Sequence, residues 1–201
     1  MMKSYTIQTV EARGEIVNAP VVRVDSFRDG SGYEPETTAA VVYVKGEGLL
    51  CRMECRETNP KAVITAFNGD TYKDSCLEFF INCAPEQGEY YLNLEGNAIG
   101  TLHCKYGKDR FGRMPLAEGI PFPACTAEIL PDRWRAEYFL SLETIRAVFG
   151  KEELLPGDIL KGNFYKCGDE TDHPHYGMWS PVTQERLDFH VPAFFGQFII
   201  A

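Results

Sequence analysis

Two segments in the middle of the chain alternate apolar and polar residues, and this pattern predicts a β-hairpin. The first segment covers residues 76–82 and the second covers residues 90–97, with a turn-rich stretch at 84–88 between them. Because successive side chains of a strand point to opposite faces, one face of this hairpin is apolar. The apolar residues expected in the core are Leu77, Phe79, Ile81, Leu92 and Leu94. The hairpin therefore predicts a protein whose core is built against a sheet.

Short strand-like segments continue along the rest of the chain, separated by stretches rich in glycine and proline. We expect them at residues 21–24, 39–44, 49–54, 134–140, 159–167 (with Phe164 in the core) and 197–200. One short helix is expected after Ser141, which can cap it, and before Gly150, which can end it. Residues 110–123 and 168–192 should form long loops. Many strands and few helices predict an all-β fold, a β-sandwich of two mostly antiparallel sheets, with residues 1–201 as one domain.

The charge and the cysteine content exclude several classes of protein. The formal net charge of −9 argues against a nucleic-acid partner, because phosphate binding requires clustered basic residues. No apolar run approaches the ~20 residues of a membrane span, so no membrane partner is expected. Seven cysteines at irregular spacing do not resemble a disulfide framework. Since the N-terminus also lacks a signal-like apolar stretch, the protein is expected to be cytoplasmic, with reduced cysteines.

The opposite face of the hairpin carries the residues that suggest a function. It would gather two carboxylates, three amides and two aromatic rings: Glu78, Phe80, Asn82, Tyr91, Asn93, Glu95 and Asn97. Planar polar groups can bind pairs of sugar hydroxyls, and a flat ring can stack on the C–H face of a sugar. The pattern therefore indicates a carbohydrate site. The alternative interpretation is an ordinary solvated sheet face, which the same alternation also predicts.

Several motifs taken together resemble carbohydrate-binding module family 9, a relative of the DOMON-like sandwiches. They follow the order of the family along most of the chain: residues 74–81, 93–97, Gly100, Thr101, Trp134, 162–165, 179–181, 188–190, Phe195 and Gly196. The resemblance implies a jelly-roll-like sandwich that binds a mono- or oligosaccharide, such as a chain end, without catalysis. Related modules are usually attached to secreted glycoside hydrolases, so the resemblance also implies a link to carbohydrate catabolism.

The resemblance further implies a set of site residues. In a well-known member, two tryptophans clamp a terminal sugar, and acidic and amide side chains bind its hydroxyls. Tyr72 and Trp179 match the two aromatic positions, and Glu78 and Asn97 match polar ligands. Glu95 stands where that member has a basic residue. The predicted ligand-binding residues are Tyr72, Glu78, Glu95, Asn97, Lys161, Asn163 and Trp179, with Tyr72 and Trp179 as walls and with Glu95 and Lys161 setting the charge.

Two other functions use the same fold. Glu78 and Glu95 would face each other on neighbouring strands, near the roughly 5 Å that separates the carboxyls of retaining glycosidases. A glycoside hydrolase with this catalytic pair is therefore one alternative. Like charges placed so close need compensation, which Lys161, a metal or a shared proton could supply. The other alternative is a degenerate sandwich that serves protein–protein contacts.

No metal or other cofactor is assigned from the sequence. Potential metal ligands crowd one loop at Cys167, Asp169, Asp172, His173 and His175, but their spacing matches no standard zinc pattern. Calcium is known in relatives of the family. A glycine-rich loop carries three oxygen ligands of suitable type, Asp25, Asp29 and Glu34, but their spacing does not define a cage.

One histidine is expected to have a structural role. His190 matches a family motif near the last strand, in the sequence Asp-Phe-His-Val-Pro. We expect its ring nitrogens to tie the long loop at 168–192 to the sheet.

Overall fold

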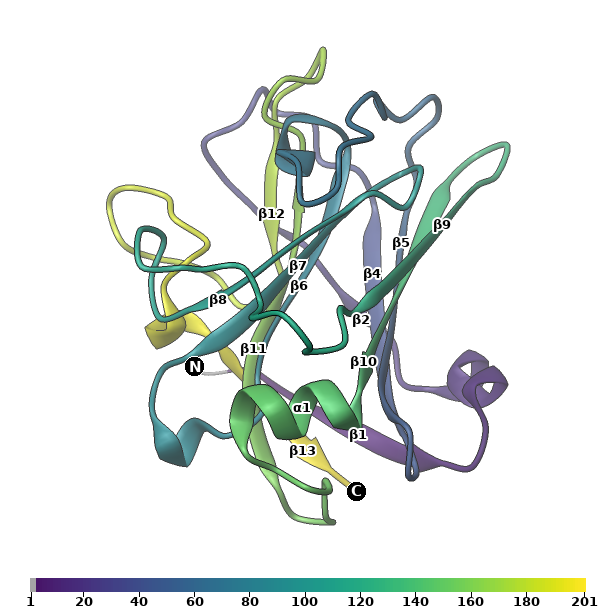
Figure 1. Cartoon of the computed structure of the whole chain (residues 1–201). Coiled ribbons are helices and arrows are strands. Elements are labelled where there is room, and N and C mark those ends of the chain that lie inside the picture. The colour runs from purple at the N-terminus through teal and green to yellow at the C-terminus, as the bar shows by residue number, and fades with distance from the viewer. Residues whose placement is uncertain (1–2) are drawn as a thin grey trace.

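The computed structural model describes residues 3–201 and shows a protein built almost entirely from β-strands (Figure 1). These residues form thirteen strands and a single α-helix, α1 at Leu142–Phe149. The strands are β1 Ser4–Val10, β2 Val22–Arg23, β3 Ser26–Phe27, β4 Thr37–Val44, β5 Gly48–Cys55, β6 Cys76–Asn82, β7 Tyr91–Asn97, β8 Leu102–Gly107, β9 Ala124–Ile129, β10 Trp134–Ser141, β11 Ile159–Cys167, β12 Tyr176–Met178 and β13 Gly196–Ile200. The prediction of an all-β fold with one short helix is confirmed.

The strands follow one continuous path, in the order β8-β7-β6-β11-β13-β1-β4-β5-β10-β9. Strand β1 joins the two halves of this path, because residues 4–7 pair with β13 and residues 8–10 pair with β4. Both of these pairings are parallel, whereas the other ladders along the path are antiparallel. The fold is therefore mostly antiparallel, as expected. It differs from the expected pair of separate sheets because β1 divides its length between two neighbours.

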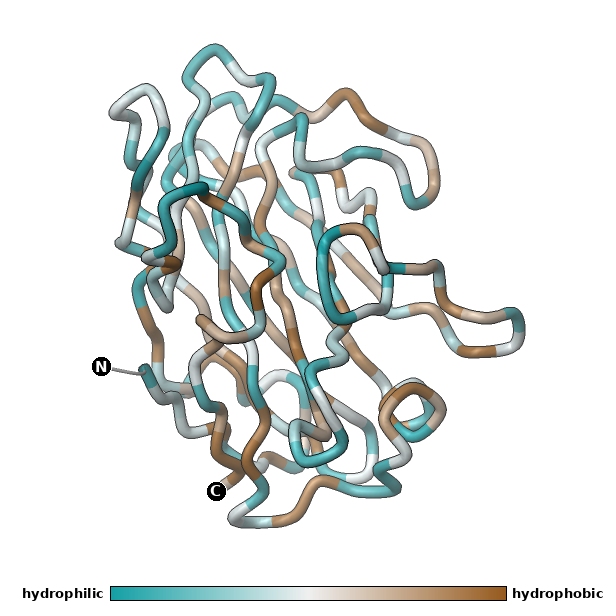
Figure 2. The backbone as a smooth tube through the Cα atoms, turned by 90° about the vertical axis from the view of Figure 1, so that its left-hand side faces the viewer, coloured by the Kyte–Doolittle hydropathy of each residue, from teal (hydrophilic) through white to brown (hydrophobic). Residues whose placement is uncertain are grey.

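The main core lies between the two halves of the sheet. Figure 1 shows β4, β5 and β10 on one side and β6, β7 and β11 on the other, and Figure 2 shows hydrophobic segments running along the strands. The side chain of Tyr138 on β10 crosses this core. Its hydroxyl donates to the Leu77 carbonyl at 2.5 Å and accepts from the Gly96 N–H at 3.1 Å. The predicted apolar face of the hairpin is buried here, and Phe79 stacks on Phe164 with ring centroids 5.4 Å apart.

The polar face of the hairpin is buried as well, so the solvated-face interpretation is wrong. A second apolar cluster covers this face, and its members include Phe80, Tyr91, Tyr165 and Phe189. Phe189 comes from the segment after β12, which folds back over the sheet and stacks this ring on Tyr165 at 4.1 Å. A long loop that carries its own apolar side chains can bury a sheet face that alternation alone would leave to solvent.

Local signals define α1 as the sequence predicts. Ser141 accepts a hydrogen bond from the Thr144 N–H at 3.1 Å, and Gly150 ends the helix with a φ of 70°, a left-handed conformation that glycine adopts without strain. Strands β1, β3, β8, β9 and β12 were not predicted, and β12 lies inside the expected loop at 168–192. Within residues 3–201, no helix has the length and apolar character needed to cross a membrane.

Candidate functional site

A cavity of about 400 Å³ opens against the buried polar face of the β6–β7 hairpin. Its floor comes from four strands, with Glu78 on β6, Glu95 on β7, His103 on β8 and Cys167 on β11. Loops and a 3₁₀ turn at Thr71–Lys73 supply the sides. The sheet therefore fixes the polar floor, and the irregular segments shape the opening.

Two carboxyl groups meet on the floor. Glu78 and Glu95 are directly opposite each other on neighbouring strands, and each is only 3% exposed. The Cys167 thiol donates to Glu78 Oε1 at 2.9 Å, and the Asn93 amide donates to Glu95 Oε1 at 2.8 Å. Burial raises the pKa of Glu78 well above its usual range, and the Glu95 carboxyl adds to the shift. Burial also raises the pKa of Glu95, so the pair carries less negative charge than two free glutamates.

Two arginines from the loop after β8 bring positive charge to the same cavity. Arg113 Nη1 lies 3.4 Å from Glu95 Oε1, and both side chains are largely buried. Arg110 holds Asp188 through two hydrogen bonds, at 2.9 Å and 3.1 Å. Lys161, proposed above as the compensating charge, does not line the cavity; it pairs in register with Asn82 and Gln197, away from the two glutamates. Arg113 takes that compensating role instead.

Aromatic side chains form part of the cavity wall. Tyr72 lies on the 3₁₀ turn, Tyr176 begins β12, and both pack against the second apolar cluster while keeping part of their surface exposed. His190 also reaches the cavity, and its Nδ1 lies 2.9 Å from the Tyr91 hydroxyl on β7. The prediction that His190 ties the long loop to the sheet is confirmed. Because burial and Arg113 lower the pKa of His190 well below its usual value, its ring is neutral.

The structure brings three of the seven predicted site residues together and separates the other four. Tyr72, Glu78 and Glu95 line the cavity, whereas Asn97, Lys161, Asn163 and Trp179 do not. The two amides are buried and use their hydrogen-bonding capacity within the protein. The amide NH₂ of Asn97 donates to the Ile64 carbonyl and to Asp74 Oδ2, at 2.8 and 2.9 Å. The side chain of Asn163 exchanges two 2.8 Å hydrogen bonds with the backbone of Ser180.

Trp179 lies in the main core, so it does not face Tyr72 over Glu78. The ring of Trp179 packs against Phe164 and Phe198, with centroid distances of 5.5 and 5.3 Å, and only 3% of its surface is exposed. The reason is strand alternation. Met178 is opposite Tyr165 in the β11–β12 ladder and shares its cluster, so the next residue points to the other face. The same alternation turns Tyr176 toward the cavity face.

Neither of the two candidate sets of metal ligands from the sequence analysis comes together as a set. Asp25 pairs with Lys3 at 3.4 Å and Asp29 with Arg28 at 3.1 Å, and no group of three ligand atoms includes either of them or Glu34 in the described chain. These three side chains therefore do not converge as carboxylate ligands of one ion. The loop after Cys167 likewise forms no such group with its aspartates and histidines in residues 3–201.

Several cavity residues escaped the sequence analysis. Arg110, Arg113 and Tyr176 lie in segments that were expected to be loops, and His103 lies on the unpredicted strand β8. The sequence does contain a signal for Tyr176, because it stands three residues before Trp179, on the other face of an extended segment. No signal of this kind marks the two arginines, since their position depends on how a long loop folds.

Comparison with known proteins assigns the chain to a family. The family model of carbohydrate-binding family 9 matches residues 15–200. Because this match covers most of the chain, the protein belongs to carbohydrate-binding family 9. A search among functionally curated proteins finds no match.

Three solved structures of similar architecture come from two organisms, and their sequence identity to this chain ranges from 13% to 26%. A protein from Bacteroides uniformis ATCC 8492, described as a candidate carbohydrate-binding protein, is 26% identical, with a TM-score of 0.84 over 100% of both chains. A family 9 module from Caldicellulosiruptor kristjanssonii in complex with glucose is 13% identical, with a TM-score of 0.68 over 99% of this chain and 96% of that one. The same kind of module in complex with cellotriose gives 14% identity, a TM-score of 0.66 and coverage of 98% and 93%.

Proposed function

We propose that this protein binds carbohydrate without catalysing its conversion, and that the ligand occupies the cavity beside Glu78 and Glu95. One observation carries the proposal: the cavity combines planar polar groups, fixed on a sheet, with tyrosine rings on its wall. Membership of carbohydrate-binding family 9 supports the same chemistry. So do the similar modules that were solved with glucose and with cellotriose.

The size and polarity of the cavity suit a short ligand. Its volume of about 400 Å³ lies toward the small end of small-molecule sites, which extend to roughly 1,000 Å³. A monosaccharide, a disaccharide or the end of a longer chain would fit this space. Such a ligand is consistent with a role linked to carbohydrate catabolism.

Each cavity residue has a distinct role in this proposal. Burial favours the protonated form of Glu78, which can both donate to and accept from sugar hydroxyls. Glu95 can accept from them, and Arg113 adds a charged donor beside it. Tyr72 and Tyr176 provide faces for the apolar side of the sugar. Tyr176 thus takes the wall position that the resemblance assigned to Trp179.

The remaining predicted residues act from behind the site. Asn97 and Asp74 hold the backbone of residues 63 and 64, and Asn163 holds the chain that leaves β12. Trp179 anchors that chain in the core. We assign these three residues, Asn97, Asn163 and Trp179, to positioning rather than to ligand contact, and we assign no ligand contact to Lys161.

Calorimetric titration with glucose and cellotriose tests the proposal. Tyr72→Ala should weaken binding about 2- to 12-fold, the equivalent of the 0.5–1.5 kcal/mol of an aromatic contact. Glu78→Gln replaces the carboxyl hydroxyl, which can donate and accept, with an amide NH₂ that only donates, and should weaken binding by a similar factor. Lys161→Ala is the matched control, a half-buried residue on the same sheet but outside the cavity, and should bind like the unmodified protein. Equal affinity in all three variants would place the binding surface elsewhere.

The same samples test the hydrolase alternative. Glu78 and Glu95 share one cavity, which is the arrangement that a catalytic pair requires. Incubation with cellotriose should nevertheless release no glucose or cellobiose. Release that disappears in Glu78→Gln would replace the binding proposal with a hydrolytic one.

We also propose that the protein works in a reducing compartment such as the cytoplasm. Its seven cysteines are all free thiols, and six of them are buried. In such a compartment buried thiols serve as small apolar side chains. Fractionation of the native cells with an antibody to this chain would check the location.

A further inference from the structure

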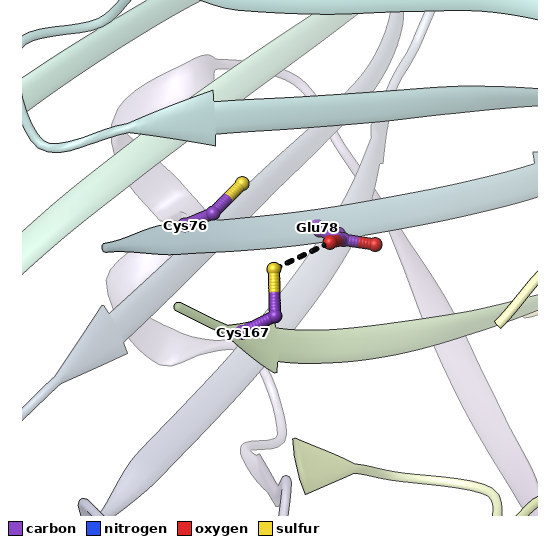
Figure 3. A group of neighbouring side chains, drawn as sticks. All are labelled: Cys76, Glu78 and Cys167. Atoms are coloured by element: carbon purple, nitrogen blue, oxygen red, sulfur yellow. Dashed lines mark hydrogen bonds between the residues drawn. The ribbon is translucent and has the colours of Figure 1, made fainter. Parts of the chain in front are cut away.

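We propose that Cys76, Glu78 and Cys167 form a binding site for a thiophilic divalent ion of the zinc type on the floor of the cavity. Figure 3 shows the three side chains, two on β6 and one on the neighbouring strand β11. One ligand atom from each residue lies within 4.8 Å of the other two. All three residues are buried, with at most 3% of their surface exposed. This is the one group of three such ligand atoms in residues 3–201.

Strand geometry explains why the ligands converge. Cys76 and Cys167 are directly opposite each other in the β6–β11 ladder. Glu78 stands two residues further along β6, so its side chain lies on the same face as that of Cys76. The backbone of two paired strands therefore fixes all three ligands, and no mobile loop is needed to bring them together.

The spacing suits a tetrahedral ion after small side-chain movements. With metal–sulfur distances of about 2.3 Å and metal–oxygen distances of about 2.1 Å, the sulfurs would be about 3.8 Å apart and each sulfur about 3.6 Å from the oxygen. The thiol of Cys167 now lies 2.9 Å from Glu78 Oε1, as a hydrogen bond. Replacing this hydrogen bond by an ion would open the pair by about 0.7 Å, which a side-chain rotation can supply.

The fourth coordination position would face the cavity. Glu78 and Cys167 both line the cavity, so an ion between them is reachable from solvent. Sites with three protein ligands and one open position exchange water or a small ligand at that position. Two thiolates favour zinc or cadmium over calcium or magnesium, which prefer ligand sets made of oxygen.

Uptake of the ion would release protons. Burial raises the pKa of the Cys76 thiol to about 11. The hydrogen bond to Cys76, and after it burial, raise the pKa of the Cys167 thiol well above its usual value. The divalent ion would replace the two thiol protons and the Glu78 proton, so three protons leave and the site carries one net negative charge. Arg113 and Lys166 favour this charge, whereas Glu95 and Asp169 oppose it. Affinity should therefore rise steeply with pH.

Cadmium titration of the reduced protein tests the site. The protein would be reduced, desalted without oxygen and titrated with Cd²⁺ alone, while thiolate-to-metal charge-transfer absorption is followed in the ultraviolet. We expect one ion per chain, an apparent affinity that increases at least tenfold from pH 6 to pH 8, and displacement by excess Zn²⁺. Cys76→Ser and Cys167→Ser should each lower the affinity at least tenfold. Cys104→Ser is the matched control, a fully buried thiol on β8 that lies in the main core.

Several outcomes would overturn the proposal. It fails if the unmodified protein gives no charge-transfer band, or if the band survives both Cys76→Ser and Cys167→Ser. It also fails if mass analysis finds these two cysteines joined by a disulfide and the reduced protein binds no cadmium, since the pair would then be a redox pair. If a serine variant does not fold by circular dichroism, Glu78→Gln decides, because it should keep the band but weaken binding. Sugar titration of the metal-free protein is an independent measurement, so the two proposals can fail separately.

Discussion

Lys166 and Glu57 form a buried ion pair whose disruption should be among the most damaging single changes in this protein. Lys166 is fully buried, with its Nζ 3.3 Å from Glu57 Oε2 and 3.0 Å from the Cys167 carbonyl oxygen. Glu57 in turn accepts hydrogen bonds from the indole of Trp134 and the hydroxyl of Ser75, both at 2.9 Å. The pair therefore depends on a closed set of partners in the interior.

The structure predicts a different cost for each partner. Removing one member of a buried pair costs about 3–5 kcal/mol, because the other charge is left uncompensated. Glu57→Gln should fall at the high end, since the buried Lys166 would keep only neutral acceptors. Lys166→Met should fall near the low end, since Trp134 and Ser75 would still donate to Glu57. The double variant should cost less than the sum of the two, by up to about 3 kcal/mol.

Urea unfolding of the unmodified protein, the two single variants and the double variant at neutral pH measures these free-energy costs. Additive losses, or a loss below about 1 kcal/mol in each single variant, would refute the reasoning.

A pH series adds a second check. Although burial alone would raise it, Lys166 and Trp134 hold the pKa of Glu57 below its usual value. The native state then binds fewer protons than the unfolded state, so this contribution is present above the usual carboxyl pKa and is lost as pH falls through the native pKa. Glu57→Gln should lack this loss.

Three further predictions follow from packing and titration. Trp179→Ala should lower the free energy of unfolding by about 3–5 kcal/mol in urea, since its ring fills the core; a change below about 1 kcal/mol would place the ring at the surface. Burial raises the pKa of Glu78, so the native state binds extra protons between the usual carboxyl pKa and the raised one, and stability falls as pH rises through that window. Glu78→Gln should therefore raise the melting temperature more at pH 8 than at pH 4, and an equal effect at both would contradict the shift. Dithiothreitol should leave the melting temperature of the metal-free protein unchanged, whereas a clear drop would reveal a disulfide that contributes to stability.

Much of the fold could be predicted from alternation because the central strands have one face in the main core. The hairpin β6–β7, the strands β10 and β11, and the helix α1 all carry the expected pattern. Strand β9 could not be found this way. It is an edge strand whose residues are mostly exposed, so no apolar face marks it. Strand β12 has only three residues, too few for a period to show.

The candidate site was predictable in part, for a related reason. Alternation places Glu78 and Glu95 on one face, and the family motif adds Tyr72, which indeed lines the cavity. The same alternation predicted Asn97 and Asn163 on that face. It could not indicate that the side chains of both residues hydrogen-bond to loop backbone groups instead of a ligand. Arg113 reaches Glu95 through a long loop, and its position depends on tertiary packing that no local pattern encodes.

The divided pairing of β1 has a consequence for how the chain folds. Residues 8–10 pair with β4, which follows soon in the sequence, whereas residues 4–7 pair with β13 near residue 200. During synthesis, one end of β1 can find its partner early, and the other end must wait until the chain has been made as far as β13. Closing this junction is a contact of very high sequence separation, which slows folding. Until β13 arrives, β1 and β11 each present an unpaired strand edge, the kind of surface through which nascent chains associate with one another.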